Sequence, residues 1–145
     1  MLHIYVQFIE CEDMVHFKEC SASSEATNWE CKNVYGKDTG WESLNNDASP
    51  WIKLNLKDEY ELQQLKIQTT GGIKKFAQIL IEFSDGSNQS EKLESSDSWN
   101  VITLPRIHSR FIKIARITSF GPSSEEVGIS NIKASGCPTG KFIIS

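Results

Sequence analysis

The 145 residues include 39% hydrophobic and 10% aromatic ones, enough for one packed domain, which excludes a chain that is disordered throughout. The net charge of −4, with no cationic face evident in the sequence, argues against nucleic acid and against anionic lipid as partners. No run approaches the roughly 20 apolar residues that a membrane-spanning helix needs. We interpret residues 1–145 as a single domain.

The apolar stretch at residues 1–9 is short, alternating and not basic, so it does not predict a signal peptide. Hydrophobic residues then alternate with polar ones along most of the chain, and this period of two predicts short β-strands. The predicted strands fall at 4–8, 52–56, 65–67, 79–83, 101–103, 112–114 and 129–134.

Turn residues separate these strands at 71–72, 85–88 and 121–124, and Pro105 is expected to end the strand before it. No segment has a helical stripe of ten or more residues. About eight short strands with regular turns predict an all-β antiparallel sandwich or barrel, and periodicity does not choose between these two.

Four cysteines lie at positions 11, 20, 31 and 137. An even number in a small β-rich domain predicts two disulfides, whereas four reduced thiols would indicate a cytoplasmic protein. The absence of a Cys-x-x-Cys pair argues against zinc. Asn88 begins an Asn-Gln-Ser triplet in a turn-rich stretch and is a candidate N-glycosylation site, in keeping with secretion.

Nothing in the sequence predicts catalysis. The chain contains neither Gly-x-Ser-x-Gly nor His-Glu-x-x-His, and no glycine loop that would cradle a phosphate. The acidic residues form surface runs, such as those at 91–97 and 125–126, which a solvated face explains better than an acid–base pair. We therefore expect no catalytic residues and no enzymatic activity.

Several weak motifs follow one another in an order that resembles the discoidin family, the type C domains of coagulation factors. The motifs are at 21–25, 41–43, 51–56, 83–87 and 110–114. The resemblance extends over about 14–137, which we take as the core of the domain. It implies an eight-stranded antiparallel jelly-roll sandwich of the galactose-binding-like type, a fold that mostly binds ligands rather than transforming them.

The resemblance also implies how the cysteines pair. Members of the family bring their two ends together, which favours a disulfide between Cys11 and Cys137 and leaves Cys20 to pair with Cys31 across the first polar loop. Both bonds would place the domain outside the cell or at the cell surface, with a cytoplasmic location as the alternative. Trp41, Trp51 and Trp99 match family positions that pack in the core.

Loops at one end of the barrel form the binding surface in this family, and here they would be 23–31, 38–50 and 70–76. An exposed tryptophan offers a flat apolar face to a sugar ring, while amides and carboxylates bind its hydroxyls. The implied ligand-binding residues are Trp29, Asn28, Asn45, Asn46 and Asp47. The alternative is that Trp29 plugs the end of the barrel.

The implied function is recognition of glycans or glycoproteins in adhesion. The alternative is a protein–protein interaction scaffold of the same fold without a sugar site. Lipid-binding members carry several bare hydrophobic side chains on their loop tips, with basic residues behind them. Here only Trp29 and Leu44 could serve and the nearby charges are mostly acidic, which argues against a membrane partner.

Many members of the family hold calcium between the loop after the first strand and the last strand. Tyr35 occupies the position of the loop aspartate, and Asn131 occupies that of the strand glutamate. Calcium binds six to eight oxygens, usually with carboxylates among them, so these replacements disfavour a bound ion. Asp38 and Asn131 are the candidate ligands if calcium binds, and we expect no other cofactor.

Overall fold

The computed structural model describes residues 6–8, 11, 14–36, 39–69, 76–94, 98–119, 128–139 and 142–144. Within these residues, no helix is both long and apolar enough to cross a membrane. The elements are β1 (Val6–Phe8), β2 (Phe17–Ala22), α1 (Asn33–Gly36), β3 (Trp41–Glu42), β4 (Ile52–Thr69), β5 (Phe76–Phe83), β6 (Asn88–Lys92), β7 (Asn100–Ser119), β8 (Gly128–Pro138) and β9 (Phe142–Ile144).

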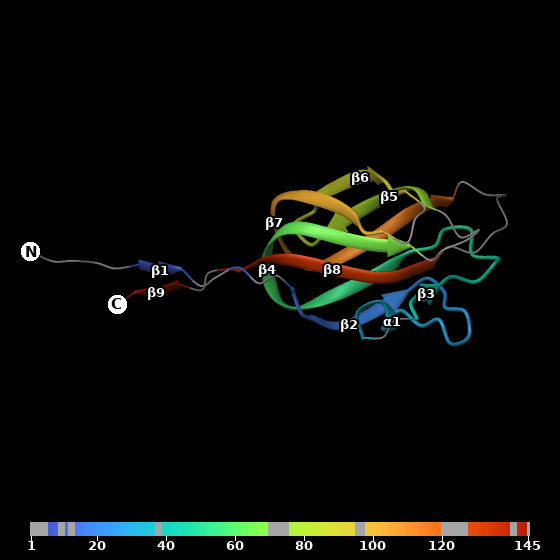
Figure 1. Ribbon diagram of the computed structural model, residues 1–145, viewed down its shortest axis with the longest axis horizontal. Coiled ribbons are helices and arrows are strands. Elements are labelled where there is room, and N and C mark those ends of the chain that lie inside the picture. The colour runs from blue at the N-terminus through green and yellow to red at the C-terminus, as the bar shows by residue number, and fades with distance from the viewer. Residues whose placement is uncertain are drawn as a thin grey trace, which may run out of the picture.

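The main sheet is antiparallel throughout and has the strand order β3-β8-β4-β7-β5-β6, with β2 paired to β4. It curls around one hydrophobic core, whereas β1 and β9 pair separately beyond one end of the sheet (Figure 1). This curled antiparallel sheet is the expected all-β jelly-roll architecture.

Two long strands, β4 and β7, give the sheet its curl. The first part of β4 pairs with β2 and with the end of β7, and its second part pairs with β8 and with the start of β7. The strands predicted at 52–56 and 65–67 are thus one bent strand. The alternation of buried and exposed residues in β4 is interrupted at 57–59 and again at 63–64. At both places the ladder to β7 shifts register through a bulge. After each bulge the apolar side chains of β4 again face the core.

Pro105 does not end a strand, and the prediction that it would is wrong. It lies inside β7, where residues 104–106 bulge between the Leu62–Ile107 and Gln64–Thr103 pairs. Proline lacks a backbone N–H and is tolerated where no ladder hydrogen bond is needed. Arg106 follows it with φ of 51°, and the chain bends there instead of leaving the sheet.

Trp41 is fully buried, and its Nε1 donates a hydrogen bond of 2.8 Å to the carbonyl of Ser24. Trp51 and Trp99 are only half-buried, which corrects the expectation that they pack in the core. The ammonium of Lys113 lies 4.8 Å from the centre of a Trp51 ring, and that of Lys133 lies 5.1 Å from a Trp99 ring. Cation–π contacts thus cover these two rings on the outer surface.

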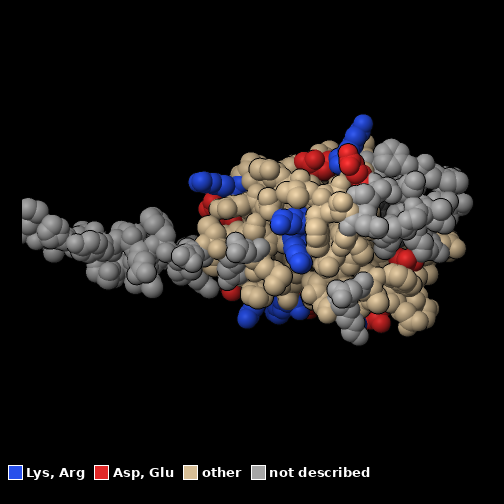
Figure 2. Space-filling model, viewed as in Figure 1, with Lys and Arg blue, Asp and Glu red and all other residues tan. Residues whose placement is uncertain are grey.

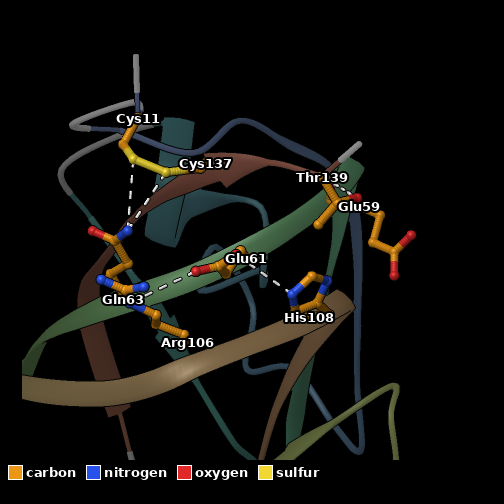
Figure 3. Close-up of polar contacts among 8 residues, drawn as sticks. All are labelled: Cys11, Glu59, Glu61, Gln63, Arg106, His108, Cys137 and Thr139. Carbon is orange, nitrogen blue, oxygen red and sulfur yellow. Dashed lines mark hydrogen bonds and ion pairs between the residues drawn. A yellow bond between two sulfur atoms is a disulfide. The ribbon is translucent and has the colours of Figure 1, made fainter. Parts of the chain in front are cut away.

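The bends of β4 and β7 meet at one end of the molecule, together with the Cys11–Cys137 disulfide (Figure 3). The Nε2 of Gln63 donates to both sulfurs, at 3.6 Å and 3.5 Å. The carboxylate of Glu61 lies 3.8 Å from Arg106 Nε and 3.4 Å from His108 Nε2. This end is therefore held by a covalent bond and polar contacts, and both β4 and β7 run back from it toward the other end of the sheet.

Candidate functional site

The loops at residues 23–31 and 39–50 lie at the other end of the sheet, and we call this end the rim (Figure 1). β2 ends at Ala22 and β4 begins at Ile52, and these two residues face each other in the ladder. The chain between them contains the two rim loops that the structure describes, at residues 23–31 and 39–50. Both loops therefore project from the same edge of the sheet. The third expected loop, 70–76, lies outside the described residues except for the backbone of Phe76.

Asp47 ties the two rim loops together. Its Oδ2 accepts hydrogen bonds of 2.5 Å from the hydroxyl of Ser23 and 2.6 Å from that of Ser24, and its Oδ1 accepts one of 3.1 Å from the Ser49 amide. Burial raises the pKa of Asp47, but the hydrogen bonds from Ser23, Ser24 and Ser49 together outweigh burial and hold that pKa below its ordinary value.

The serine hydroxyls extend this network into the backbone. Ser24 Oγ accepts a hydrogen bond of 3.0 Å from the Leu44 amide, and Ser23 Oγ accepts one of 2.9 Å from the Trp51 amide. Each hydroxyl thus donates a hydrogen bond to the Asp47 carboxylate and accepts one from a backbone amide in, or directly after, the second loop. Sequence reasoning assigned no role to Ser23 and Ser24, because hydroxyls in a polar loop carry no signal of their partners.

The Cys20–Cys31 disulfide closes the first rim loop. Inside it, Glu25 Oε2 accepts a hydrogen bond of 2.6 Å from the Cys31 amide. Trp29 joins the loops through its backbone, because its amide donates to Ala26 and its carbonyl accepts from Glu42. Asn28 adopts a φ of 70°, in the left-handed region that asparagine tolerates better than most residues.

The five predicted ligand-binding residues lie on these two loops. Asn28, Asn45 and Asn46 are exposed, Trp29 is half-buried, and Leu44 adds an apolar side chain that is 45% exposed. Asp47 differs from the others, because both of its oxygens already accept hydrogen bonds from the protein. The structure thus places the predicted residues on two loops at one edge of the sheet, and their contacts with a ligand stay a prediction.

The candidate calcium ligands are only half described. Asn131 lies in β8 opposite Gln68, and it lines a cavity next to Tyr35. Asp38 lies outside the described residues. In the part of the chain that the structure describes, no three His, Cys, Asp or Glu side chains gather as metal ligands would.

Asn88, the predicted glycosylation site, is exposed at the start of β6. It follows the turn after Phe83, which pairs with Ile112 near the bend of β7, so it lies away from the rim. The structure thus leaves room for a glycan there, and the modification itself stays a prediction.

A curled antiparallel sheet with braced loops at one end is an arrangement suited to ligand binding. The family model of the F5/8 type C domain matches residues 19–127, so this chain belongs to that family. No curated protein matches the sequence of this chain.

Solved structures of the same fold include several carbohydrate-binding modules. The family 32 module of C. perfringens NanJ, in complex with galactose, has 18% identity and a TM-score of 0.70, over 81% of this chain and 92% of that one. A pectin-binding module has 16% identity and a TM-score of 0.68, over 83% and 91%. A fucose-binding module from Streptococcus pneumoniae has 18% identity and a TM-score of 0.62, over 83% and 94%.

Proposed function

We propose that this chain is a non-catalytic module that binds glycans, or the glycans of glycoproteins, through its two rim loops. The observation that carries the proposal is a half-buried hydrogen-bond network that braces the loops carrying exposed amides. Asp47, its serine partners and the Cys20–Cys31 disulfide fix the loops that carry Asn45 and Asn46. Loops that are rigid before binding lose less conformational entropy when a ligand binds.

The side chains on this surface suit a sugar. Asn28, Asn45 and Asn46 each offer an amide donor and an amide acceptor to hydroxyl groups. Trp29 and Leu44 offer apolar surface on which the C–H face of a sugar ring can pack. A similar structure in complex with galactose, and two others described as pectin-binding and fucose-binding modules, support the same class of ligand.

We further propose that the protein works outside the cell. Two disulfides formed from all four cysteines suit an oxidising compartment and would be reduced in most cytoplasms. An exposed sequon asparagine is compatible with secretion.

The test is a glycan array that includes galactose- and fucose-terminated glycans, followed by titration of the best uncharged ligand. We expect Trp29→Ala to weaken binding about tenfold, because an aromatic stacking face contributes roughly 1.5 kcal/mol. Asn45→Ala and Asn46→Ala remove exposed side chains without opening a cavity, so they test the site with little risk to the fold.

Asn88→Ala is the matched control, because it removes another exposed asparagine at a distance from the rim. Protein without N-glycans should be used, so that the control changes only the side chain. If the wild type binds no glycan at high density, or if Asn88→Ala weakens binding as much as the rim variants do, the proposal is wrong. Binding to a protein that lacks glycans would instead support the scaffold alternative.

A further inference from the structure

Two lysines lie side by side on the outer surface of the sheet, away from the rim. Lys66 of β4 and Lys133 of β8 are directly opposite each other in the antiparallel ladder, a position in which like charges repel. Neither has an ion-pair partner among the described residues. We call the surface around them the lysine face; Figure 2 shows basic side chains in the middle of the view, surrounded mostly by uncharged atoms.

Lys133 lies between two depressions in this surface. On one side is a cavity of about 160 Å³, whose lining includes His16, Tyr35 and Asn131. On the other is a smaller one of about 40 Å³, lined by Lys66, Gln64 and Ser135 as well as by Lys133. Lys133 is the one residue in the lining of both depressions, so it can contact a molecule that lies in either of them.

A second lysine pair in the same sheet shows what a structurally satisfied pair looks like. Lys53 and Lys113 are also directly opposite each other, in β4 and β7. The ammonium of Lys53 lies 4.2 Å from the centre of the Phe111 ring, Lys113 covers Trp51, and Glu82 faces Lys113 in the neighbouring strand. Lys66 has neither a ring contact nor an acidic neighbour in the ladder, so its charge has no such structural use among the described residues.

We propose that the lysine face is a second binding site, for acidic saccharides that carry carboxylate or sulfate groups. The two ammonium groups would bind the anionic substituents, and the amides of Asn131 and Gln64 would bind sugar hydroxyls. The ring of Trp99 lies under the Lys133 ammonium and positions it beside Lys66.

The geometry favours a saccharide over an acidic peptide. A peptide that binds a sheet usually pairs with an unpaired strand edge through its backbone. Lys66 and Lys133 project from two strands that are paired with each other at this point, so side chains rather than backbone groups face a ligand of the lysine pair. The inference is independent of the proposed rim site, because the two surfaces share no residue.

The experiment titrates the full chain with galacturonate oligosaccharides and with the same oligosaccharides after methyl esterification. We expect the acidic form to bind more tightly and its affinity to fall as salt rises to about 0.15 M and above, where screening shortens the reach of exposed charges. The double variant Lys66→Gln, Lys133→Gln should weaken binding about tenfold or more.

The matched control is Lys53→Gln, Lys113→Gln, which removes the same charge from the other cross-strand pair. It should retain wild-type affinity, and so should Trp29→Ala, which separates this site from the rim. Thermal unfolding of every variant shows that it is folded. Equal losses in both lysine pairs, no preference for the acidic form, or tighter binding of polyglutamate than of the saccharide would each overturn the proposal.

Discussion

Asp47 connects the two rim loops through its side chain. Ser23, Ser24 and Ser49 lie before and after it in the sequence, and its carboxylate bonds to all three. These hydrogen bonds favour the charged form, which is why its pKa is lowered despite burial. The free energy of unfolding therefore depends on whether the Asp47 carboxyl group, which connects the two rim loops, is protonated.

We predict that acid weakens the fold through this residue. A carboxyl group with a lowered pKa in the folded state stabilises it above the unfolded value, about 3.9, and this contribution is lost as the pH falls through the folded pKa. The free energy of unfolding should decrease more steeply with acidification in the wild type than in Asp47→Asn. Thermal unfolding near neutral pH and at steps below about pH 4 measures the difference.

Ser24→Ala should also reduce the acid dependence, because it removes one donor to the carboxylate. Thr27→Ala changes an exposed residue of the same loop and should leave the wild-type slope unchanged. Identical slopes for the wild type and Asp47→Asn would contradict the role assigned to Asp47.

The two disulfides act on different elements of the fold. Cys11–Cys137 joins the N-terminal segment to the end of β8 across 126 residues of sequence, at the end away from the rim. Cys20–Cys31 joins β2 to the start of the α1 region across 11 residues and closes a rim loop. The chain-entropy model gives a larger stabilisation to the longer closed loop, about 4–5 kcal/mol against about 3 kcal/mol.

We predict that removing these bonds separates stability from binding. Cys11→Ser, Cys137→Ser should lower the free energy of unfolding more, yet leave glycan affinity nearly unchanged in the folded protein. Cys20→Ser, Cys31→Ser should cost less stability but weaken glycan binding, because the first rim loop is no longer closed. Denaturant unfolding and glycan titration on both double variants test this. The reverse order of effects on affinity would contradict the placement of the site at the rim.

At the scale of the whole molecule, the bent strands place the rim loops at one end of the sheet and the chain termini at the other. β4 and β7 each begin and end near the rim and bend at the other end, beyond which β1 and β9 lie side by side (Figure 1). The two described rim loops therefore lie at the end of the sheet opposite β1 and β9. A shallow, solvent-exposed sugar site buries few ligand atoms and is expected to be weak by itself.

We predict that joining copies raises apparent affinity without any new contact. Two copies connected by a flexible linker should bind a dense glycan surface about 10²-fold or more tightly than one copy, because the second binding event becomes intramolecular. Surface-based binding at high and low glycan density measures the gain. A tandem protein in which one copy carries Trp29→Ala is the control, and a gain that persists in it would contradict avidity through the rim.

Much of the fold could be predicted because its signals are local. Alternation of period two marks strands wherever a sheet has one buried face, and the order of weak motifs indicated the family that the type C domain model shows. The disulfide pairing came from resemblance to that family, and the structure forms the same two pairs. The candidate ligand residues were placed on loops that do share one rim.

Other features depend on which distant segments meet, and the sequence does not contain that information locally. The alternating pattern did not indicate that 52–56 and 65–67 belong to one bent strand, because the pattern is interrupted between them. In the structure, bulges at these interruptions restore the buried face of the same strand. Trp51 and Trp99 were expected in the core because they match family positions that pack there, but strand register decides which face a side chain takes. Lys66 and Lys133 of the lysine face are far apart in the sequence, and only the pairing of β4 with β8 places them opposite each other.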